Sequence, residues 1–124
     1  MPKLHRSQWL TELKRAFPEL TDELNAEQGQ LAFEMEVFSR FIRQRIADRD
    51  RQAVTASYAI ALKYFIGGNR RMRDAIDTCL VENLSFGRPD ERPSNWAWKE
   101  LPPPLKDLYQ RFHDANMTNG DQGA

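Results

Sequence analysis

Residues 51–66 read RQAVTASYAIALKYFI, and this is the most apolar stretch of the chain that helical spacing organises. Polar positions reduce to a narrow stripe at Gln52 and Lys63, while the small side chains allow neighbouring helices to approach closely. The pattern predicts a helix from about Arg51 to Ile66 that is nearly buried at the centre of the fold.

The segments on either side of this helix predict turns that reverse the chain. Asp48-Arg49-Asp50-Arg51 precedes it, and after it Gly67-Gly68 is predicted as a left-handed C-terminal cap. Asn69 then caps a helix that reaches about Leu84. Before the first turn, residues 30–47 carry apolar rows that sweep about 220° of a helix, so this helix is expected to contact neighbours on two sides.

The remaining elements complete an all-α prediction. A first helix ends near Ala16, a corner follows at Phe17-Pro18-Glu19-Leu20, and a last helix starts near Pro104. We expect a compact stack of about five antiparallel helices, resembling the α-α hairpins of HEAT or armadillo proteins, with one long Pro- and Trp-containing loop at 85–103. Residues 1–116 form one predicted helical domain, and residues 117–124 a disordered tail.

Charge is distributed unevenly along the chain. The stretch Val37–Arg73 holds nine Arg or Lys and two acidic residues, whereas both flanks are acidic and the net charge is zero. Its predicted solvent-facing members are Arg40, Arg43, Arg70 and Arg73. They can pair with the acidic flanks, bind an acidic protein surface, or bind nucleic acid. A pI near 6.7 makes nucleic acid the least favoured.

Residues that carry catalytic or metal chemistry are sparse. His5 and His113 lie at opposite ends, Cys79 is the single cysteine, and Gly67-Gly68 follows a helix instead of the strand that a phosphate-binding loop requires. We therefore predict no catalytic site, no cofactor and no metal. The start of the chain does not have the pattern of a signal peptide, and no apolar run reaches about 18 residues, so a cytoplasmic location without a membrane span is expected.

The loop at 85–103 contains Trp96 and Trp98, whose alternation in an extended segment would point one into the core and the other outward. Both can fix the loop to the helices, or the outward one can be a binding hot spot. The charged residues expected to rim it are Arg88, Asp90, Glu91 and Arg92.

Two charges fall on the apolar side of the helix at residues 30–47. At 100° per residue, Glu34 and Arg45 lie about 40° and 20° from Phe38, close to the middle of the buried face. Each can reach solvent near a helix end, or form an ion pair with another helix.

Several short motifs together resemble a known family. They are Phe17-Pro18-Glu19-Leu20, Phe38, Glu82-Asn83-Leu84, Leu101-Pro102-Pro103-Pro104-Leu105 and Tyr109. The combination resembles a family of small uncharacterised bacterial all-α proteins, a domain of unknown function, over residues 10–112. That resemblance implies no catalytic residues. In size and helical build the chain is also similar to immunity proteins, which neutralise a toxin by binding it.

These observations favour a non-enzymatic protein-binding module, with an immunity protein that neutralises a cognate, secreted bacterial toxin as the leading hypothesis. The predicted contact residues are Trp96, Trp98, Asp90, Glu91, Arg40, Arg43, Arg70 and Arg73. The alternative is a nucleic-acid-binding or regulatory helical domain that uses the same arginines. Either a monomer or a homodimer is compatible with the sequence.

Overall fold

The computed structural model describes residues 3–123, with side chains described for residues 3–114. Its α-helices are α1 (Arg6–Ala16), α2 (Thr21–Ala26), α3 (Leu31–Ala47), α4 (Arg51–Gly67), α5 (Arg70–Ala75), α6 (Trp96–Glu100) and α7 (Pro103–Gly123). Shorter turns are the 3-10 segments η1 (Pro18–Leu20), η3 (Val81–Asn83) and η4 (Arg92–Ser94), and the π-helical η2 (Ile76–Leu80). The all-α prediction is confirmed.

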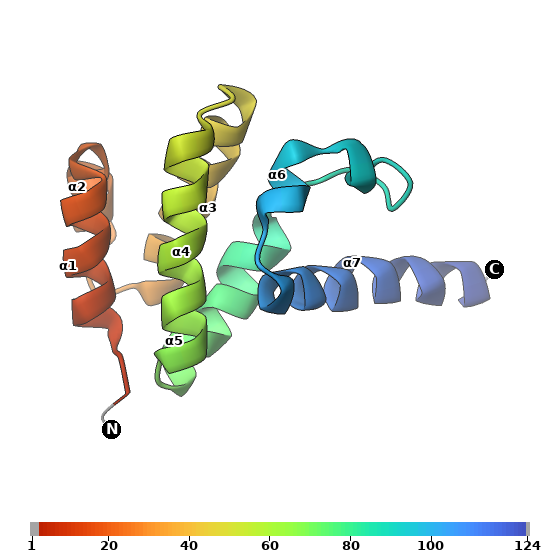
Figure 1. Ribbon diagram of the computed structural model, residues 1–124. Coiled ribbons are helices and arrows are strands. Elements are labelled where there is room, and N and C mark those ends of the chain that lie inside the picture. The colour runs from red at the N-terminus through yellow and green to blue at the C-terminus, as the bar shows by residue number, and fades with distance from the viewer. Residues whose placement is uncertain (1–2, 124) are drawn as a thin grey trace.

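The helices have two main orientations, one shared by α1, α3 and α4 and the other taken by α7 (Figure 1). α1, α3 and α4 stand roughly side by side, and the turn after α3 reverses the chain into α4. The helix α7 runs across this group at a steep angle, starting beside the segment that follows α5. The expected antiparallel stack therefore describes the N-terminal part of the fold, whereas α7 crosses it.

A single hydrophobic core joins both groups, with members from Trp9 in α1 to Tyr109 in α7. Trp9, Phe38 and Ile76 are completely buried, and the Trp9 and Phe38 rings lie 6.1 Å apart. The π-helical turn η2 packs directly on α3 and carries the core from the N-terminal helices toward α7. One core of this size explains why the helices hold together without a disulfide.

The order of burial of the two central helices differs from the prediction. α4 was expected to be nearly buried, but Thr55, Ala59 and Lys63 are exposed along one face, and Ile66 near its end is 66% exposed. α3 is the more buried helix, since Leu31 to Ile42 place eight residues in the interior. The apolar composition of α4 reflects its many alanines, which need no burial to favour a helix.

The two glycines after α4 do not form the predicted left-handed cap. Gly67 ends the helix, and Gly68 is extended, with φ −77° and ψ 158°. The backbone of Leu4 donates to Gly67 O at 2.8 Å and accepts from Asn69 N at 2.7 Å. A Cβ on Gly68 would lie 2.1 Å from the carbonyl oxygen of Tyr64. The glycine is needed because this carbonyl and the Cβ of Met72, which would lie 2.9 Å away, leave no room for a side chain.

The starts of α5 and α7 can be compared with the helix boundaries predicted from the sequence. The Asn69 cap is confirmed, since its side chain accepts from Met72 N at 3.0 Å. α7 begins at Pro103 and its backbone continues to Gly123, through the segment expected to be a tail; the domain boundary at residue 116 stays a prediction.

Across residues 3–123, no helix combines the length and apolarity that crossing a membrane requires.

Candidate functional site

The segment between η3 and α7 is more ordered than the predicted loop. It contains the 3-10 turn η4 and the short helix α6, so the Trp96–Trp98 stretch is helical and not extended. Asn95 starts α6, because its Oδ1 accepts from Ala97 N at 2.9 Å while its Nδ2 donates to Phe86 O at 3.4 Å. Only residues 84–91 and the short links remain without helical structure.

Arg92 anchors this segment to α7. The residue Arg92 is only 4% exposed, and its guanidinium donates to both carboxylate oxygens of Asp114, at 3.0 and 3.3 Å. Its Nε donates to Gly87 O at 3.2 Å. The charge also lies 5.2 Å from the ring centre of Trp98 and 4.9 Å from that of Tyr109. The expectation that Arg92 belongs to an exposed rim is wrong, because these partners surround it.

An aromatic cluster packs between this segment and α7. Phe86, Trp98 and Tyr109 meet edge to face, with ring centres 5.1–5.4 Å apart. The hydroxyl of Tyr109 accepts from Phe86 N at 3.1 Å. Tyr58 of α4 donates its hydroxyl to Ala97 O at 2.9 Å, and burial, with a smaller contribution from Glu100, raises the pKa of Tyr58. These contacts fasten α6 to both α4 and α7.

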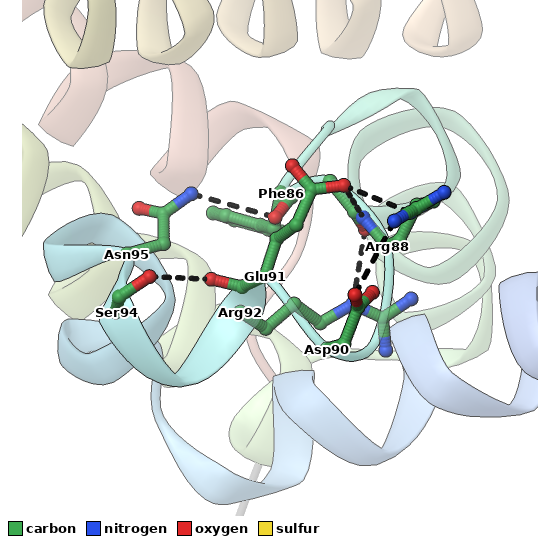
Figure 2. A network of polar contacts seen from close by, with 8 residues as sticks. Phe86, Arg88, Asp90, Glu91, Arg92, Ser94 and Asn95 are labelled. Atoms are coloured by element: carbon green, nitrogen blue, oxygen red, sulfur yellow. Dashed lines mark hydrogen bonds and ion pairs between the residues drawn. The ribbon is translucent and has the colours of Figure 1, made fainter.

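The exposed tip of the segment is charged (Figure 2). Arg88 is paired with Asp90 at 3.3 Å and with Glu91 at 3.1 Å, and the three side chains are 58–71% exposed. Gly87 turns the chain with φ 82°, a conformation that favours glycine. Ser94 donates to the carbonyl of Glu91 at 3.0 Å. We call residues 85–91 the charged tip. Its charged side chains are exposed, whereas the backbone at both of its ends is fixed by contacts with the rest of the fold.

The two tryptophans have different environments. Trp98 is 8% exposed and packs in the aromatic cluster, so in this conformation it supports the segment and does not present a contact surface. Trp96 is half-buried, and Arg51 of α4 lies 5.3 Å from its ring centre. The expected division of one tryptophan inside and one outward, which assumed an extended segment, is wrong: Trp98 is buried and Trp96 packs partly against the core, so both fix the segment to the helices.

The four predicted arginines are exposed, but the structure does not bring them together. Arg40 lies on α3 beside α2, 3.8 Å from Glu23, and Arg43 is one turn further along the same helix. Arg70 and Arg73 lie on α5, at the other end of α4, where they line a cleft that neither α3 arginine reaches. The basic stretch of the sequence therefore becomes two separate surfaces.

The two charges on the apolar side of α3 differ in burial and in the partners that they bind. Glu34 is completely buried and accepts two hydrogen bonds from Arg6 of α1, with Nε to Oε1 at 2.7 Å. The alternative of an ion pair with another helix is correct for Glu34. Arg45 instead pairs with Asp48 in the next turn at 2.9 Å and keeps 31% of its side chain exposed.

Acid-base side chains meet where Glu12 accepts from Lys63 Nζ at 2.8 Å and from the hydroxyl of Tyr64 at 2.9 Å. Among residues 3–114, whose side chains the structure describes, no group of three or more His, Cys, Asp and Glu side chains is placed to hold a metal ion. His113 stacks on Tyr109 with ring centres 3.9 Å apart, and burial, followed by the charge of Arg92, lowers the pKa of His113. Cys79 is half-buried beside Thr78. Neither group has a partner arrangement typical of a nucleophile and its base.

Sequence reasoning missed the role of Arg92. It stands in the charged run Arg88-Pro89-Asp90-Glu91-Arg92, where composition favours exposure for every member. Its carboxylate partner lies 22 residues away, beyond the range of any local pattern.

Comparison with known proteins places the chain by family. No curated protein and no solved structure matches it. A family model described as a domain of unknown function, DUF7674, matches residues 10–115, which include every buried core residue except Trp9. The chain therefore belongs to the DUF7674 family, a domain of unknown function.

Proposed function

We propose that this protein is a non-enzymatic binding module that docks a protein partner through its charged tip. The observation that carries the proposal is a contrast between neighbouring charges. Asp90 and Glu91 are exposed, while Arg92 next to them is buried and anchors the segment. A preorganised loop loses little conformational entropy on binding, so a larger share of its contact energy appears as affinity.

The tip favours a basic partner surface. Asp90 and Glu91 share one exposed Arg88, whose pairs with them are weak in water and can be exchanged for a partner's cations. Trp96 lies on the same segment and is half-buried under Arg51, so it can extend the contact area beside the acidic pair.

The specific form that we propose is an immunity protein, acting in the cytoplasm on a toxin that the same cell or its competitors secrete. The partner would be a toxin whose active site or substrate groove is basic, and the tip would cover it. This reading predicts one tight protein partner and growth protection of cells that express the chain.

The test is co-expression with toxin-like genes encoded beside this one. The chain should rescue growth and form a stable complex, and the double change Asp90→Asn and Glu91→Gln should weaken both. A matched control exists on α2, where Asp22→Asn with Glu23→Gln removes an equally exposed Asp-Glu pair. If no neighbouring gene is toxic and affinity purification recovers no stoichiometric partner, the proposal is abandoned.

Nucleic-acid binding remains the second candidate because Arg40, Arg43, Arg70 and Arg73 are all exposed. Their separation into two surfaces counts against a continuous phosphate-binding stripe. A salt titration of binding to random duplex DNA distinguishes the two candidates: micromolar affinity that falls steeply with salt favours nucleic acid. Absence of binding at low salt removes this candidate.

A further inference from the structure

A cleft of about 420 Å³ is lined by residues of the N-terminal segment, the end of α4, α5, the π-helical turn η2 and α7. It uses none of the residues of the charged tip. Four cations from three parts of the chain line it, namely Lys3, Arg70, Arg73 and Arg111. The volume falls in the range typical of small-molecule sites, about 300–1,000 Å³.

These cations outnumber the carboxylates of the cleft. Among the described side chains, none of the four forms an ion pair, although Arg6, Arg45, Arg88 and Arg92 all do. Asp74 and Asp77 also line the cleft and leave the cations in excess, four to two; burial and the charge of Asp74 raise the pKa of Asp77, while the charge of Arg111 lowers it. An excess of positive charge in a cleft raises the local concentration of anions. The arrangement therefore has the composition of an anion site.

The wall of the cleft is partly apolar. The guanidinium of Arg73 lies 5.4 Å from the ring centre of Phe65, and Leu108 contributes an aliphatic side chain that is 8% exposed. A cation-π contact of this kind leaves the N–H groups of the guanidinium able to donate to a ligand. A ligand that fills this cleft would place a charged group on the arginines and an organic part on Phe65 and Leu108.

The lining also includes Asp77, which lies in the π-helical turn η2. Isolated π-turns are rare and occur frequently at functional sites, because the widened turn displaces side chains from ordinary helical positions. Here the turn places Asp77 on the cleft while Ile76 and Leu80 remain in the core.

We propose that this cleft binds a small phosphate ester, with its phosphate groups held by Arg70, Arg73 and Arg111 and its organic part resting on Phe65. Phosphate is favoured because its geometry matches the paired N–H groups of arginine and because more than one negative charge is needed to balance the lining. Lys3 adds a fourth positive charge to the lining.

The test is calorimetric titration of the full chain with adenosine diphosphate and inorganic pyrophosphate at low salt. We expect binding of the diphosphates and none of adenosine. Arg70→Gln and Arg111→Gln should each weaken binding about tenfold, the loss of one charge-assisted hydrogen bond. Arg71→Gln is the matched control, since Arg71 is equally exposed on α5 but lies outside this cleft. It should change affinity less than about twofold.

A gain of affinity guards against misfolding as an explanation. Asp77→Asn removes a competing negative charge and should tighten binding about threefold, which an unfolded variant cannot do. The proposal is overturned if neither diphosphate binds at millimolar concentration, if Arg71→Gln weakens binding as much as Arg70→Gln, or if a glutamate-rich peptide binds while the diphosphates do not.

Discussion

Replacing Arg92 by alanine tests the central structural claim, that one buried cation holds the charged tip. The change removes the two hydrogen bonds to Asp114, the bond to Gly87 O and the contacts with two aromatic rings. A hydrogen bond to a charged group contributes about 1.5–3 kcal/mol, and a partly buried cation-π contact about 1 kcal/mol.

These contributions do not simply add. The side chain of Asp114 is 38% exposed, so water replaces part of the lost ion pair, and the neighbouring contacts are coupled. We expect Arg92→Ala to lower the free energy of unfolding by about 3 kcal/mol. For a chain of 124 residues this corresponds to a fall in Tm of about 10 °C.

The assay is urea denaturation followed by tryptophan fluorescence, together with amide hydrogen exchange over residues 84–95. Exchange in this segment should accelerate more than in α3, because the tip loses its anchor while the core remains. Arg88→Ala is the matched control: its side chain is 71% exposed, and it should cost less than about 0.5 kcal/mol. If the two variants have equal stability and equal exchange, Arg92 does not hold the tip.

Three further changes test other contacts. Glu34→Gln removes a buried charge from the ion pair between α1 and α3 and should cost about 2 kcal/mol in urea denaturation, since the guanidinium of Arg6, 30% exposed, loses charge-assisted hydrogen bonds that water replaces only in part; no measurable cost would contradict the pairing. Gly68→Ala places a Cβ 2.1 Å from a backbone carbonyl and should cost about 1–3 kcal/mol in the same assay; wild-type stability would show that the chain adjusts freely. A hydrogen bond from Lys63 is the largest cause that lowers the pKa of Glu12 below its ordinary 4.5, so this carboxylate stabilises the fold above that pH and the benefit is lost as pH falls through its lower folded value. Glu12→Gln should therefore be less stable than wild type at pH 7 and approach it at pH 3; a constant difference between the two would refute this linkage.

The sequence by itself determined the helices, because their signals are local. The corner at Phe17-Pro18, the turn before Arg51 and the cap at Asn69 depend on φ restriction and on side chains that bond their own backbone a few residues away. Apolar spacing likewise predicted the buried face of α3. The exposed face of α4 was not predictable, because alanine favours a helix whether or not a neighbour covers it.

Only the tertiary structure decided which charges are structural and which are available. Arg92 looks like an ordinary surface charge in sequence, yet it is buried because a partner 22 residues away meets it. The position of Glu34 on an apolar face is visible in the sequence, but its partner Arg6 lies 28 residues away and is not. Arg43 and Arg70 look like members of one basic stretch, yet Arg43 lies on α3, and Arg70 starts α5 after the whole of α4. Burial and pairing depend on which helices pack together, and packing is settled by contacts between segments that no local spacing encodes.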